Sequence, residues 1–117
     1  MIDAEIQTVR RPAADDPLLT DVVRRLVDVY HPQRIYLFGS TARGDAGADS
    51  DYDLMVILPD EASPDLRRED PGYRALRGTG VAADLQVWPQ AHFDSQLHLK
   101  ASFPSTIVRE GKLLYGA

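Results

Sequence analysis

The chain is short, acidic and free of cysteine. Its 117 residues can bury one modest core, so we expect a single domain over residues 1–117. The lack of cysteine excludes disulfides, thiolate metal sites and cysteine nucleophiles, and the net charge of −5 argues against general nucleic-acid binding.

The N-terminal residues carry no targeting signal that we can identify. No apolar stretch approaches the roughly 20 residues of a membrane span, and "MIDAEIQTVRRP" lacks the apolar core of a signal peptide. We therefore expect a cytoplasmic protein with no membrane partner. Residues 1–14 are mixed in composition and are expected to form a loosely held arm.

The next segment, "DDPLLTDVVRRLVDVY", predicts a helix over residues 15–30. Asp16 can cap it, Pro17 suits its first position, and Pro32 stops it. Five side chains share its apolar face: Leu19, Val22, Val23, Leu26 and Tyr30.

Three strands are predicted after this helix, over residues 34–39, 50–59 and 81–89. The second is almost continuously apolar after its first positions, which indicates a strand covered on both faces. Between the second and third strands, Ser63-Pro64 can begin a short helix, Pro71-Gly72 interrupts the connector, and "YRALRG" predicts a further helical turn.

Residues 90–117 are expected to be mostly helical, with a break near Pro104 and a final "KLLYG" that forms an edge strand or a tail. These elements together predict an α/β (α+β) chain in which helices pack on one small sheet.

Polar residues with a metal- and phosphate-binding character flank the first two strands. Gly39 permits close approach of the backbone to a phosphate, Ser40 offers a hydroxyl, and Arg43 offers a forked donor one helical turn later. Asp51 and Asp53 lie about 6–7 Å apart on one side of a strand, where their charges repel unless a cation such as Mg²⁺ is bound.

A third carboxylate belongs to the next strand. Asp84 stands between Ala83 and Leu85, inside an apolar run in which an unpaired charge would be costly. A metal shared with the adjacent strand would supply a partner, and the resulting set of groups suits phosphoryl or nucleotidyl transfer.

The stretch "GSTARGDAGADSDYDL" resembles the motif of the polymerase-β-type nucleotidyltransferase superfamily, with Gly-Ser, ten residues, then Asp-x-Asp. Asp84 matches the later third carboxylate of that superfamily. The small size and the "REGKLLYG" ending are most similar to the minimal nucleotidyltransferases (the MNT group), over roughly residues 18–116.

This resemblance implies a mixed sheet flanked by helices, with ATP and two Mg²⁺ ions in a cleft. Asp51 and Asp53 would bind both metals, and Asp84 would bind the catalytic metal and help to activate the incoming hydroxyl. Gly39 and Ser40 would bind the β- and γ-phosphates, with Arg43 near them.

The resemblance also implies a reaction and a partner. Members of the MNT group act as antitoxins beside a small helical HEPN toxin, and some transfer AMP from ATP to a tyrosine of that toxin. The chain has no predicted helical second domain of the kind that binds small substrates in larger relatives, which favours a protein acceptor.

Other interpretations of the sequence stay open. The chain could neutralise a toxin by binding alone, or it could adenylylate a small molecule such as an aminoglycoside. Asp51 and Asp53 could cap a turn, Asp84 could face solvent at a strand edge, and Arg43 could form a surface ion pair. A homo-oligomer is possible, and the acceptor and the base specificity cannot be read from the sequence.

The remaining notable side chains are expected to be structural. The three histidines show no ligand spacing, Tyr52 is expected in the core, and Trp88 at its rim or within it. Four apolar residues near the C-terminus are expected to close the core, although an exposed subset could meet a partner: Ile107, Val108, Leu113 and Leu114. Four arginines form a possible basic patch or a solvated helix face: Arg67, Arg68, Arg74 and Arg77.

Overall fold

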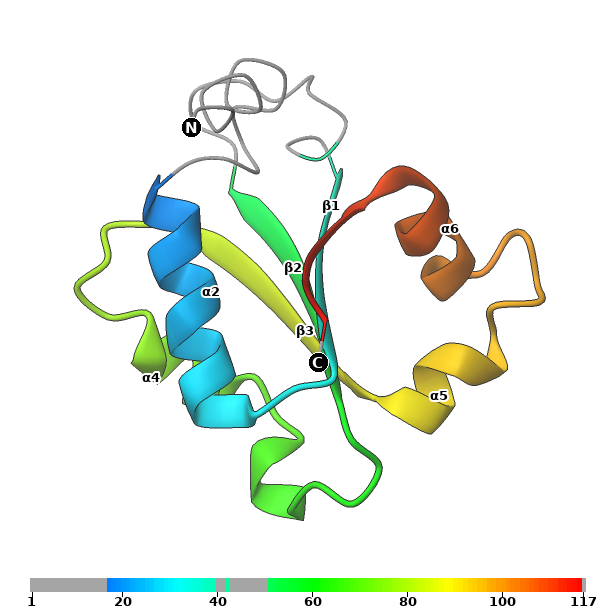
Figure 1. Cartoon of the computed structure of the whole chain (residues 1–117), viewed down its shortest axis with the longest axis horizontal. Coiled ribbons are helices and arrows are strands. Elements are labelled where there is room, and N and C mark those ends of the chain that lie inside the picture. Colours follow the sequence, from blue (N-terminus) through cyan, green and yellow to red (C-terminus); the bar gives the residue numbers. More distant parts are fainter. Residues whose placement is uncertain (1–16, 40–41, 43–50, 117) are drawn as a thin grey trace.

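A computed structural model of the protein describes residues 17–39, 42 and 51–116 (Figure 1). The strands are β1 (Arg34–Phe38), β2 (Tyr52–Leu58), β3 (Ala83–Pro89) and β4 (Lys112–Gly116). The helices are α2 (Pro17–Tyr30), α4 (Asp70–Ala75), α5 (Gln90–Ser95) and α6 (Phe103–Glu110), with a 3₁₀ turn η1 (Pro64–Leu66). The predicted α+β class is confirmed.

The four strands form one mixed sheet in the order β3-β2-β1-β4. The β1 strand is antiparallel to both β2 and β4, whereas β2 and β3 are parallel. A parallel pair needs a crossover connection, which η1 and α4 provide here. The segment "KLLYG" is an edge strand, β4, and β3 forms the opposite edge.

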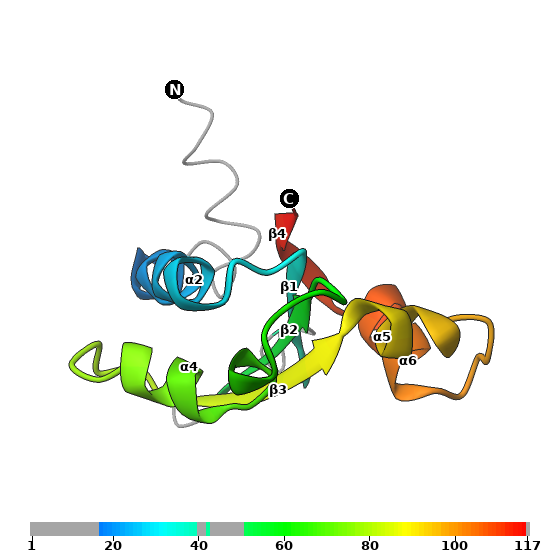
Figure 2. The ribbon, with the colours of Figure 1, turned by 90° about the horizontal axis from the view of Figure 1, so that it is seen from below.

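Helices cover both faces of the sheet, as Figures 1 and 2 show. On one face, α2 packs over a cluster that includes Ile35, Leu54 and Val56. On the other face, α5 and α6 pack over a smaller cluster that includes Tyr36, Met55 and Phe93. Because side chains alternate along a strand, neighbouring residues of β2 belong to different clusters.

The central strand β2 is more deeply buried than the edge strand β3. Residues Leu54–Leu58 of the central strand β2 are fully buried, which confirms a strand covered on both faces. In the edge strand β3, buried Leu85 and Val87 alternate with exposed Asp84 and Gln86. The expectation that Asp84 lies within a buried apolar environment is therefore wrong, and the alternative that it faces solvent at a strand edge is confirmed.

The α2 helix begins at Pro17, as predicted, while Asp16 lies outside the described residues. Its buried side chains repeat at helical spacing and belong to the predicted apolar face: Leu19, Val22, Leu26 and Tyr30. The helix ends where His31 takes a φ of 48° ahead of Pro32. No helix among the described residues is long and apolar enough to cross a membrane.

The Pro71-Gly72 pair does not interrupt the connector but lies within α4, so that prediction is wrong. Proline is tolerated in the first turn of a helix, where its missing N–H has no helical partner to lose. Gly72 permits close packing, since a Cβ at this position would lie 2.5 Å from Leu85 Cδ1 and 2.8 Å from the Tyr30 hydroxyl.

The Tyr30 hydroxyl joins α2 to the start of α4. It accepts a hydrogen bond from the buried Gly72 N–H at 2.9 Å and donates to the Arg68 carbonyl at 2.6 Å. Burial raises the pKa of Tyr30 above its ordinary value of 10.0. The neutral phenol is therefore the form that the folded protein favours.

We expect Tyr30→Phe to lower the free energy of unfolding by about 1–3 kcal/mol, because it leaves the buried Gly72 N–H without its acceptor. The raised pKa in the folded state also contributes stability that is complete below about pH 10 and is lost as pH rises through the folded-state pKa. Urea titrations at pH 8 and above pH 10 measure both effects.

Tyr115→Phe is the control, because the Tyr115 hydroxyl makes none of the hydrogen bonds found within the described residues. Equal stability and an equal loss at high pH in Tyr30→Phe and the wild type would contradict the role given to the Tyr30 hydroxyl.

The predicted break in the C-terminal helical region precedes Pro104. It separates α5 from α6, and Pro104 occupies the first turn of α6, where Ser102 accepts a hydrogen bond from the Ser105 N–H at 3.1 Å. Beyond it, Ile107 is buried and Leu114 half-buried, so both close the core as predicted. The other two predicted core residues, Val108 and Leu113, are exposed.

Candidate functional site

The parallel pairing of β2 with β3 sets two of the predicted site residues side by side. Asp53 is the register partner of Asp84. Paired residues on adjacent strands lie about 4.8 Å apart, and their side chains leave the same face of the sheet. That face is the one that also carries Met55, because Asp53 and Met55 are two residues apart. The carboxylates therefore share one end of the sheet's α5/α6 face.

Gly39, directly after β1, lies against the same carboxylate. Its φ is 77°, a left-handed conformation that favours glycine. A Cβ at this position would collide with Asp53 Oδ2 and would lie 3.2 Å from Asp53 Cγ. The preceding residue, Phe38, is the register partner of Asp53 on β1. Glycine thus allows the turn after β1 to approach the Asp53 side chain.

Of the other predicted site residues, Asp51 is the one that the structure describes. Asp51 is exposed and precedes β2 by one residue. Ser40 and Arg43 lie outside the described residues. Within residues 17–39, 42 and 51–116, no group of three or more histidine, aspartate and glutamate side chains is close enough to hold one metal ion. The described part of the site therefore consists of Asp53, Asp84 and Gly39, with Asp51 beside them.

The chemistry of this set suits a hard divalent cation. Mg²⁺ takes oxygen ligands and is commonly held by one or two carboxylates, with water and substrate phosphates in its other positions. Asp53 is half-buried and held by the central strand, and Asp84 is exposed on the edge strand. Two such carboxylates in register fit a Mg²⁺ ion that remains open to a phosphate.

Comparison with known proteins identifies the family of the chain. The family model of the nucleotidyltransferase domain matches residues 19–114. The chain belongs to the nucleotidyltransferase domain family. The predicted resemblance is thereby confirmed at the level of the family. A search of curated proteins finds no match.

Solved structures share the fold of this nucleotidyltransferase domain. A candidate nucleotidyltransferase from Sulfolobus solfataricus is 21% identical, with a TM-score of 0.56 over 98% of this chain and 86% of its own. A toxin–antitoxin with AMP-PNP is 26% identical, with a TM-score of 0.58 over 84% of this chain and 73% of its own. A mutant of the toxin–antitoxin MntA–HpeT is 22% identical, with a TM-score of 0.56 and the same coverage.

A cluster of aromatic side chains lies on the same face of the sheet as the Asp53 and Asp84 carboxylates. Phe103, which is 38% exposed, packs edge-on against Phe38 at 5.3 Å and against Trp88 at 5.8 Å between ring centroids. The half-buried Trp88 is thus a core and rim residue, as predicted, and the exposed His92 packs on it at a tilt of 35°, with 4.4 Å between ring centroids. The sequence analysis missed Phe103, whose position depends on how α6 folds back onto the sheet.

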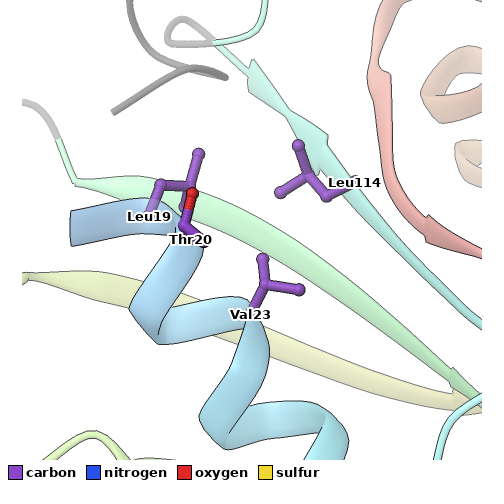
Figure 3. Close-up of a pocket in the computed structure, with 4 residues that line it drawn as sticks. All are labelled: Leu19, Thr20, Val23 and Leu114. Carbon is purple, nitrogen blue, oxygen red and sulfur yellow. The ribbon is translucent and has the colours of Figure 1, made fainter. Parts of the chain in front are cut away.

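A shallow apolar hollow lies on the other face, between α2 and β4 (Figure 3). Leu19, Thr20, Val23 and Leu114 line it. Three of these side chains pack with the α2 cluster, on the face opposite Asp53 and Asp84. With only a threonine hydroxyl among its lining side chains, the hollow does not suit a triphosphate.

The four arginines of the possible basic patch are all exposed. Arg67 donates to the Asp60 carbonyl at 2.8 Å, and Arg68 lies 3.7 Å from the Asp70 carboxylate. Both contacts are local to the connector, as expected of a solvated surface.

Proposed function

We propose that this nucleotidyltransferase domain transfers AMP from ATP, with Mg²⁺, to a hydroxyl group, and that the acceptor is a tyrosine of a HEPN-type toxin. The observation that carries the proposal is the pairing of Asp53 with Asp84, beside the turn at Gly39. Three segments of the chain meet at one end of the sheet, and each contributes a residue that the resemblance assigns to the site.

In the proposed reaction, the aspartates bind the metal and accept a proton. The acceptor oxygen forms a bond to the α-phosphorus of ATP, the bond from that phosphorus to the bridging oxygen breaks, and pyrophosphate leaves. The hydroxyl proton passes to Asp84, whose exposed carboxylate lies on the open edge of the sheet. Asp51, Asp53 and Asp84 would hold Mg²⁺, which neutralises the charge of the triphosphate when bound.

Gly39 has a separate part in the proposal. The turn after β1 brings backbone close to Asp53, so phosphates bound at this turn would share the metal that the carboxylates hold. Ser40 and Arg43 are assigned to the same phosphates on the motif alone, since both lie outside the described residues.

A protein acceptor is supported by the similar structures. Two of them are toxin–antitoxins, one with AMP-PNP, and the other bears glutamate in place of two aspartates separated by one residue. Asp51 and Asp53 have the same separation.

We expect label from [α-³²P]ATP to appear on a HEPN-type toxin when the two proteins are incubated with Mg²⁺. Label from [γ-³²P]ATP should not appear, because AMP transfer releases the β- and γ-phosphates as pyrophosphate. Substituting phenylalanine for each tyrosine of the acceptor in turn identifies the modified residue. Transfer of the γ label, or transfer of the α label without a divalent cation, would contradict the proposal.

Neutralisation by binding alone is the second candidate, and exposed apolar side chains favour it. Leu99, Phe103, Val108 and Leu113 come from α6, β4 and the segment before α6, and each is more than a third exposed. Exposed apolar surface of this kind suits a protein interface. A variant with both Asp51→Ala and Asp53→Ala that still protects cells from the toxin would favour binding alone, whereas lost protection with intact binding would favour chemistry.

A further inference from the structure

We infer that Tyr73 is a positioning residue that holds the Asp84 carboxylate in register with Asp53. This inference rests on the proposed function, since it concerns the metal ligands of the same site. Tyr73 lies in α4, the helix directly before β3, and the nucleotidyltransferase motif does not include it.

The contact is between a hydroxyl and a backbone amide. The Leu85 N–H donates a hydrogen bond to the Tyr73 hydroxyl at 3.0 Å. This N–H belongs to the peptide group that joins Asp84 to Leu85. The hydroxyl therefore fixes the plane of the peptide immediately next to the residue that bears the carboxylate.

The edge position of β3 gives this contact its importance. On the inner side, the Tyr52 N–H donates to the Ala82 carbonyl at 3.0 Å. Carbonyls alternate in direction along a strand, so the Asp84 carbonyl also faces β2 and the Leu85 N–H faces outward. The sheet holds this peptide on one side, and Tyr73 holds it on the other.

The helix that carries Tyr73 is itself anchored. Gly72, its neighbour, donates its N–H to the Tyr30 hydroxyl and packs closely on Leu85. Arg25 of α2 donates to the Ala75 carbonyl at 3.1 Å, at the other end of α4. Although 44% of Tyr73 is exposed, its hydroxyl is presented to β3 from a fixed backbone.

Tyr73→Phe removes the hydroxyl and keeps the ring. We expect the affinity for Mn²⁺, measured by electron paramagnetic resonance with a non-hydrolysable ATP analogue present, to fall about tenfold, as it does when groups that orient a metal ligand are lost. We also expect faster hydrogen exchange at the Leu85 amide. In AMP transfer by Tyr73→Phe, the Mn²⁺ concentration that gives the half-maximal rate should rise by a larger factor than the factor by which the maximal rate falls.

Tyr115→Phe is the matched control and should bind Mn²⁺ as the wild type does, with the thermal midpoint of each variant measured in parallel. Unchanged Mn²⁺ affinity and Leu85 exchange in folded Tyr73→Phe would overturn the inference, as would a wild-type protein that binds no Mn²⁺. If Tyr73→Phe does not fold, the hydrogen-exchange rate of the Leu85 amide in the wild-type protein tests the inference. A rate as fast as that of exposed loop amides would overturn it. Tight Mn²⁺ binding without AMP transfer would instead refute the proposed function alone.

Discussion

Replacing either Asp53 or Asp84 by asparagine is expected to abolish AMP transfer and leave the fold intact. Each substitution keeps the size of the side chain and removes the negative charge that would hold a divalent cation. Loss of a preorganised electrostatic group at a reacting phosphate costs roughly a hundredfold to a thousandfold in rate. Because Asp84 is exposed and Asp53 half-buried, neither change should unfold the protein.

The measurement is the rate of label transfer from [α-³²P]ATP, together with the thermal midpoint of each variant. Asp65→Asn is the matched control, since it removes an exposed carboxylate of η1 that is not part of the site. It should retain wild-type activity. Transfer within tenfold of the wild-type rate in either Asp53→Asn or Asp84→Asn would exclude that carboxylate as a metal ligand.

Gly39→Ala is expected to inactivate the enzyme through Asp53 rather than through general strain. The new Cβ would collide with Asp53 Oδ2, so the carboxylate must move away from its partner Asp84. A displacement of about 1 Å at a reacting site can cost about a hundredfold in rate. We expect a loss of at least that size in AMP transfer and a matching loss of Mn²⁺ affinity.

Gly78→Ala separates the collision from the backbone strain. Gly78 has a φ of 84°, close to the 77° of Gly39, but a Cβ there would have nothing within 4 Å. Both substitutions should cost about 1–2 kcal/mol of stability from the left-handed conformation, and Gly39→Ala should cost more, yet only Gly39→Ala should lose activity. Equal activity in the two variants would show that Gly39 does not position Asp53.

Much of the fold could be predicted from the sequence, because the decisive patterns are local. Helical spacing and Pro17 located α2, and the continuous apolar run of β2 indicated a strand buried on both faces. The spacing of Gly39 from Asp53 predicts a shared site, and in the structure a Cβ at Gly39 would lie against the Asp53 side chain.

The features that could not be predicted depend on which strands become neighbours. The exposure of Asp84 follows from the edge position of β3, and the alternation of polar and apolar residues in "DLQV" indicates one exposed face but not which strand forms the edge. The Pro71-Gly72 pair looked like a break because its local propensities are poor, whereas contact with Leu85 and Tyr30 makes glycine favourable in α4. Tyr73 was missed for the same reason, since its partner is a backbone amide of another element.

The edge position of β3 has a consequence for the stability of the site itself. A strand paired with the sheet on one side only can open at a lower free energy than the central strands. When β3 opens, Asp84 separates from Asp53, so the ability to bind metal can be lost while most of the fold remains. A metal ion and nucleotide that require both carboxylates would in turn favour the closed strand, so substrate binding would stabilise the pairing of β3 with β2.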